Sequence, residues 1–147
     1  MGLLLATASC TLALAGPCAS PAAAPTPPVG RFAISYERGG GFAAMPQKLT
    51  VEPGRYATVT ALGSDGRPHS TEFRIGVSKA KRLRAAAETA QIGEIAPPQP
   101  GTCADCFRYT VAYRGEKASV EEVDVPARMR PLIARAEALI AAHLPFH

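Results

Sequence analysis

Apolar and polar residues alternate along four segments in the first half of the chain. A two-residue period is typical of β-strands that bury one face. Turn signals separate the segments: Glu52-Pro53-Gly54-Arg55 fits a type II turn, and Asp65-Gly66 is typical of a hairpin. These strands follow one another directly, which predicts an antiparallel meander. Their expected inward positions are Phe32, Ile34 and Tyr36, then Leu49 and Val51, then alternate residues of 56–62, then Thr71, Phe73 and Ile75.

Two later segments change to helical spacing. The first covers about residues 79–91, and Ser78 directly before it is a residue type favoured as an N-cap. The second begins at Pro131, because proline lacks only a hydrogen-bond donor that the first turn of a helix does not use. The apolar stripes are Leu83, Ala86, Ala87 and Ala90 in the first helix, and Leu132, Ile133, Ala136, Leu139, Ile140 and His143 in the second.

Between the helices the alternation returns. Residues 107–113 carry Phe107, Tyr109, Val111 and Tyr113 at every second position, which predicts a central strand. The partner strand after Arg114-Gly115 changes phase at Glu121-Glu122. We expect a β-bulge there, which would turn both Val123 and Val125 toward the core.

This order of elements predicts an α+β fold. An antiparallel β-sheet of about five to six strands carries two helices packed on one face, in the order ββββ-α-ββ-α. The expected domain covers residues 31–147, long enough to bury an adequate core unaided.

The N-terminal region has a different composition. None of the first thirty residues is charged, and residues 1–16 are rich in Leu and Ala. This pattern predicts a signal peptide at 1–17, followed by a Pro/Ala-rich tether at 18–30. Cys18 and Cys10 are candidates for lipidation. The expected location is therefore the cell envelope by a lipid anchor, or the periplasm or exterior without one.

The charge of the chain excludes few classes of partner. The formal net charge is +4, and the basic cluster of Lys79, Lys81, Arg82 and Arg84 has no aromatic residues beside it. We interpret this cluster as a solvated helix face, expect no nucleic-acid partner, and expect a monomer.

His69, His143 and His147 lack the spacing of a metal site, and the serines lie in no nucleophile motif. We therefore expect no cofactor, no metal and no catalytic set.

Two short motifs remain as candidate sites. Gly39, Gly40 and Gly41 at a strand end predict positive φ angles or a close backbone approach, with Phe42 either held out for display or returned to the core. Cys103-Ala104-Asp105-Cys106 predicts a disulfide in an exported domain. A thiol-redox role for Cys103 and Cys106 stays open, although redox cysteines usually stand at a helix N-terminus and these precede a strand.

Three motifs together resemble the emfourin-like proteins, which inhibit protealysin and related thermolysin-like zinc metallopeptidases. They are residues 36–43 (Tyr-Glu-Arg-Gly-Gly-Gly-Phe-Ala), residues 105–111 (Asp-Cys-Phe-Arg-Tyr-Thr-Val) and residues 125–133 (Val-Pro-Ala-Arg-Met-Arg-Pro-Leu-Ile). Two features depart from the family: Gly39 replaces a more usual polar residue, and the export signal precedes the domain.

The resemblance implies a non-catalytic protein whose glycine loop contacts a metallopeptidase. Its expected contact residues are Gly39, Gly40, Gly41, Phe42, Ala43 and Ala44. The alternatives are an envelope lipoprotein of the same fold with a structural or other protein-binding role, and a thiol-redox protein that uses Cys103 and Cys106.

Overall fold

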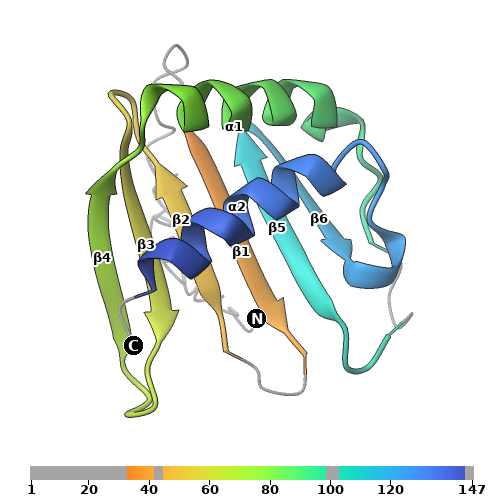
Figure 1. Ribbon diagram of the computed structural model, residues 1–147. Coiled ribbons are helices and arrows are strands. Elements are labelled where there is room, and N and C mark those ends of the chain that lie inside the picture. The colour runs from red at the N-terminus through yellow and green to blue at the C-terminus, as the bar shows by residue number, and fades with distance from the viewer. Residues whose placement is uncertain (1–32, 42–44, 99–102, 145–147) are drawn as a thin grey trace, which may run out of the picture.

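The computed structural model describes residues 33–41, 45–98 and 103–144 (Figure 1). The expected signal peptide and tether, with Cys10 and Cys18, lie outside these residues. Phe42, Ala43 and Ala44 lie outside them as well. No helix in the described ranges is both long and apolar enough to cross a membrane.

Six antiparallel strands form one sheet in the order β4-β3-β2-β1-β5-β6 (Figure 1). β1 lies inside the sheet and pairs with β2 on one side and β5 on the other, so it joins the two halves of the chain. The alternation in the sequence predicted these strands. They are β1 (Ile34–Gly40), β2 (Gln47–Val51), β3 (Tyr56–Leu62), β4 (Pro68–Arg74), β5 (Phe107–Tyr113) and β6 (Glu116–Glu121).

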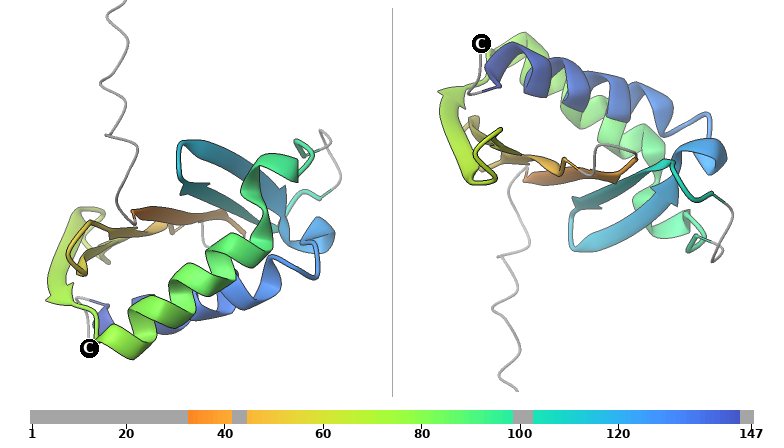
Figure 2. Two further views of the ribbon diagram at one scale, coloured as in Figure 1. Left: turned by 90° about the horizontal axis from the view of Figure 1, so that it is seen from above. Right: turned by 90° about the horizontal axis from the view of Figure 1, so that it is seen from below.

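Two antiparallel helices, α1 (Val77–Ala90) and α2 (Arg130–His143), cover the same face of the sheet (Figure 2). Two single-turn 3-10 helices, η1 (Ile92–Glu94) and η2 (Glu122–Asp124), follow α1 and β6. The element order confirms the predicted α+β fold with two helices on one face.

The core lies between the sheet and the helices. α1 contributes mainly alanines, whose small side chains allow a helix to approach its neighbours closely, while α2 contributes larger aliphatic groups. The opposite face of the sheet is polar, with cross-strand hydroxyl pairs such as Thr60–Ser70 and Thr110–Ser119. The largest fully buried side chains are Tyr36, Ile34, Leu49, Ile75, Leu83, Ile92, Met129, Leu132, Val51, Val59 and Val111.

The start of α1 differs from the prediction. The helix begins at Val77, with Gly76 rather than Ser78 as its N-cap residue. Gly76 has extended backbone angles, and its carbonyl oxygen accepts a hydrogen bond from the Ala80 N–H at 3.0 Å. Ser78 therefore lies exposed within the first turn, and no side chain caps this helix end.

The expected bulge at Glu121-Glu122 is also wrong. β6 ends at Glu121 and the chain enters η2, which leaves Val123 62% exposed while Val125 packs against the core. Glu121 is 4% exposed and accepts a charge-assisted hydrogen bond from Arg108 at 3.1 Å. A buried carboxylate needs such a partner, so Glu121 ends the strand as a paired group and does not serve solubility.

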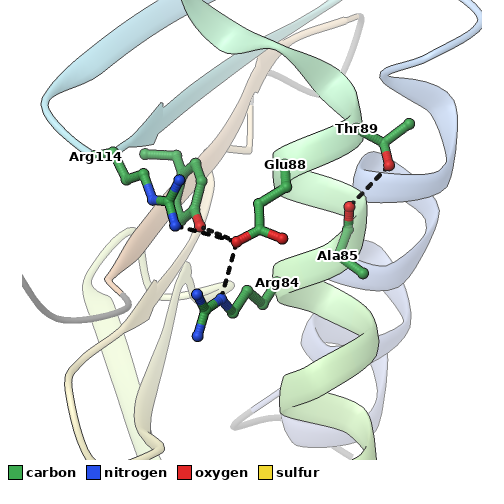
Figure 3. A network of polar contacts seen from close by, with 6 residues as sticks. Arg84, Ala85, Glu88, Thr89 and Arg114 are labelled. Atoms are coloured by element: carbon green, nitrogen blue, oxygen red, sulfur yellow. Dashed lines mark hydrogen bonds and ion pairs between the residues drawn. The ribbon is translucent and has the colours of Figure 1, made fainter.

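A carboxylate on α1 ties this helix to the β5–β6 turn. Glu88 Oε1 accepts hydrogen bonds from Arg84 at 3.0 Å, Arg114 at 3.1 Å and Tyr113 at 3.3 Å (Figure 3). These donors favour the ionised form, and the Arg84 hydrogen bond is the largest contribution that lowers the pKa of Glu88. The second half of α1 is thus held by charge as well as by its apolar stripe.

Candidate functional site

The glycine segment lies at the end of β1, where this strand still pairs with β5. Gly39 is opposite Arg108 and Gly40 is opposite Phe107 in the ladder. Gly41 ends the described part of the segment, and the chain is described again from Met45, which is 46% exposed. The base of the predicted contact loop is therefore built on two inner strands of the sheet.

Two of the three glycines are required by the local backbone. Gly40 has φ +80° and Gly41 has φ +72°, a left-handed region that disfavours other residues. A Cβ at Gly40 would lie 2.8 Å from the Cys106 carbonyl oxygen, and a Cβ at Gly41 would lie 2.7 Å from the Phe107 ring. The sequence prediction of positive φ or close approach is confirmed at both positions.

Gly39 has neither constraint. Its φ is not in the left-handed region, and a Cβ built there would meet no heavy atom within 4 Å. A residue with a side chain would therefore fit this position.

The predicted disulfide forms between Cys103 and Cys106, whose Cα atoms are 5.6 Å apart. Both cysteines are half-buried, and Cys106 immediately precedes β5. The Gly41 N–H donates a hydrogen bond to the Cys106 carbonyl oxygen at 3.1 Å. The two motifs that the sequence marked separately are thus neighbours, and the disulfide loop supports the base of the glycine loop.

Arg38 and Glu137 form an ion pair near the glycine segment, and Arg38 also contacts β2 and β5. Arg38 on β1 donates to Glu137 on α2 at 3.2 Å and to Gln47 on β2 at 2.8 Å. Its guanidinium carbon lies 4.7 Å from the centroid of the Phe107 ring on β5, within cation–π range. Arg38 therefore also contacts the Phe107 ring, which lies beside Gly41.

Sequence reasoning missed Arg38 and Glu137. The available signal was that Arg38 continues the inward series of Ile34 and Tyr36, where a charged side chain needs a partner. Glu137 lies four residues after Ile133, on the stripe of α2 that faces the sheet. A search for a carboxylate at that spacing would have found the pair.

Two tyrosines lie beside this ion pair. Tyr36 is fully buried and donates to Glu137 at 3.4 Å, and burial raises the pKa of its hydroxyl, with Glu137 raising it further. Burial also raises the pKa of Tyr109, with Glu137 and Glu122 as further causes. A cavity of about 300 Å³ lies next to Tyr109 and carries both charge signs, from Glu122, Glu137 and Arg130. The lining therefore favours neither anionic nor cationic ligands.

The histidines are not brought together. His69 pairs with Asp65 in the β3–β4 hairpin at 3.1 Å, and His143 stacks on Phe73 with centroids 3.6 Å apart. His147 lies outside the described residues. Within the part of the chain that the structure describes, no three His, Cys, Asp or Glu side chains gather in a group that could hold a metal ion.

Comparison of the chain with protein-family models and with curated protein sequences found no match in either.

Proposed function

We propose that this chain is an exported, non-catalytic inhibitor of thermolysin-like zinc metallopeptidases, and that it binds them through Gly39, Gly40, Gly41, Phe42, Ala43 and Ala44. The proposal begins from the resemblance to the emfourin-like proteins. Export follows from the uncharged, Leu/Ala-rich first segment and the Pro/Ala-rich stretch after it. The peptidase is then one that acts in the same exported compartment.

The observation that carries the proposal is the support at the base of the loop. Gly40 and Gly41 adopt left-handed angles, and Gly41 bonds to Cys106 inside the disulfide loop. A peptide that enters an enzyme cleft binds more tightly when its conformation is already fixed, because less entropy is lost on association. A rigid support also slows cleavage of the bound segment, because its peptide bond cannot move into the geometry needed for attack by the enzyme.

Phe42 is the proposed anchor. It follows Gly41 directly, and its benzyl side chain suits a peptidase that prefers a bulky apolar residue after the scissile bond. An aromatic anchor buried at an interface commonly contributes about 2 kcal/mol or more to binding. Gly40, Gly41 and Ala43 have little or no side chain, so the enzyme can approach the backbone on either side of the anchor.

Inhibition is tested by titrating thermolysin with the purified protein and following hydrolysis of a chromogenic peptide. We expect activity to fall saturably, with a complex of one enzyme to one inhibitor on a sizing column. A small hydroxamate that chelates the active-site zinc should displace the protein, because both occupy the cleft. Full activity at excess protein with no complex would contradict the proposal and favour a different protein-binding role for the same fold.

A further inference from the structure

A second surface lies between the two helices, away from the glycine loop. A groove of about 170 Å³ is lined by Lys79, Arg82 and Leu83 of α1 and by Arg135, Ala138 and Leu139 of α2. In Figure 1, α1 crosses the sheet at the end remote from Gly40. Leu83 and Leu139 are almost fully buried, and the exposed basic side chains stand around them. The groove therefore has an apolar floor and a cationic rim.

The described part of the chain places no counter-charge at the rim cations. None of the described residues that line the groove is acidic. Among the described residues, none forms an ion pair with Lys79, Arg82 or Arg135. Arg84 on the same helix differs, because it is paired with Glu88 (Figure 3). Of the basic cluster that the sequence marked, Lys79 and Arg82 line the groove, Arg84 is paired with Glu88, and Lys81 does neither.

The backbone of α1 adds to this positive potential. Lys79 lies in the first turn of the helix and Arg82 in the second, and the first turn contains no acidic residue. The N-terminal end of a helix carries the positive end of its dipole. Side-chain charge and helix dipole therefore act in the same direction at this end of the groove.

We infer that this groove binds an acidic segment of a partner protein, with carboxylates on the basic rim and one aliphatic side chain over Leu83 and Leu139. Charge complementarity selects an acidic partner, since three cations are left without protein counter-charges. The volume is below the roughly 300–1,000 Å³ of pockets that enclose a small-molecule ligand, so one side chain fits where a whole ligand does not. This binding role is separate from the proposed inhibition, because none of the residues that line the groove belongs to the glycine loop.

A bilayer surface fits the groove less well. Membrane-binding helices present protruding apolar side chains beside their cations. Here the leucines lie beneath the cations, and none of the large apolar side chains that are exposed within the described ranges, Met45, Tyr56, Val77 and Val123, lines the groove. An extended peptide can place a side chain at the floor, which a flat lipid surface cannot reach.

The test uses the peptide acetyl-Glu-Glu-Leu-Glu-Glu-amide as a probe, titrated at low salt into the isotope-labelled protein while amide NMR shifts are followed. We expect saturable shifts centred on Leu83 and Leu139. The double variant Arg82→Glu/Arg135→Glu should weaken binding at least tenfold. Arg67→Glu/Lys117→Glu is the matched control, because it changes the net charge equally at exposed residues that do not line the groove, and it should change binding by less than twofold.

Three results would overturn the inference. The first is equal binding of the uncharged peptide acetyl-Gln-Gln-Leu-Gln-Gln-amide. The second is an equal loss in both double variants, which would indicate attraction by net charge alone. The third is sedimentation with phosphatidylglycerol vesicles that depends on Arg82 and Arg135 while the acidic peptide fails to bind, which would make the surface a lipid contact. Circular dichroism of each variant establishes that it is folded.

Discussion

At the scale of single residues, the three consecutive glycines have unequal roles. A Cβ added at Gly40 would meet a backbone carbonyl and one added at Gly41 would meet an aromatic ring, while one added at Gly39 would meet no heavy atom within 4 Å. The Cys106 carbonyl belongs to the backbone that leads into β5, whereas the Phe107 ring can turn about its side-chain bonds, at the cost of its contact with Arg38. Their tolerance to a methyl group should therefore differ in a defined order.

We predict that Gly40→Ala lowers the free energy of unfolding by about 2 kcal/mol or more, from left-handed strain and the clash with Cys106. Gly41→Ala should cost about 1–2 kcal/mol for the strain alone. Gly39→Ala is the control within the same tripeptide and should change stability by no more than about 0.5 kcal/mol. Urea unfolding of the three variants measures this order, and equal losses at all three positions would contradict the described backbone.

The same residues show what the sequence predicts at this scale. Three glycines at a strand end indicated special backbone angles, because glycine is costly to order anywhere else. The sequence does not tell which two of the three glycines need those angles. That depends on how closely Cys106 and Phe107, more than sixty residues later in the chain, approach the backbone. The burial of Glu121 could not be predicted for a related reason, since it depends on where β6 ends.

At the scale of elements, alternation and helical spacing predicted all six strands and both helices. Errors occurred where one element changes into another. Ser78 is a favoured capping residue, yet the helix begins two residues earlier than expected, at Val77, because Gly76 already adopts the cap geometry. The expected bulge failed because η2 tightens the chain after Glu121 and leaves Val123 in solvent. Local patterns give the type of an element more reliably than its ends.

The disulfide loop acts on the neighbouring glycine segment, which gives a second prediction. Replacing both Cys103 and Cys106 by serine should lower stability by about 2 kcal/mol, the entropy expected for so short a closed loop. The Gly41 amide should also exchange its hydrogen faster, because the carbonyl that it bonds to is no longer fixed. The Gly66 amide, which bonds to Gly63 within the β3–β4 hairpin, serves as the internal control.

Hydrogen exchange measured by NMR on the oxidised protein and the double serine variant decides this point. Unchanged exchange at Gly41 would show that the disulfide does not support the loop. If the proposed inhibition holds, the serine variant should also inhibit thermolysin about tenfold less well, since a looser loop loses more entropy on binding. The exchange result stands whether or not inhibition is found.

At the scale of the whole molecule, two candidate surfaces use different parts of one scaffold. β1, which ends at Gly40, is an inner strand of the sheet, and the basic groove is lined by α1 and α2. Both helices cover one face of the sheet (Figure 2). Arg38, Glu137 and Phe107 connect the loop base to β5 and α2, so the loop has a folded support. If both proposals hold, one protein would engage an enzyme cleft and an acidic partner through separate surfaces.

The central claim is that Phe42 enters a metallopeptidase cleft from a rigid support. Its most direct test is the inhibition constant of Phe42→Ala against thermolysin, beside Tyr56→Ala, which removes an exposed aromatic from the opposite end of the sheet. We predict that the constant rises at least about thirtyfold for Phe42→Ala, as expected for an interface anchor, and stays within about twofold for Tyr56→Ala. A Phe42→Ala protein with the parent's melting temperature and the parent's inhibition constant would contradict the account.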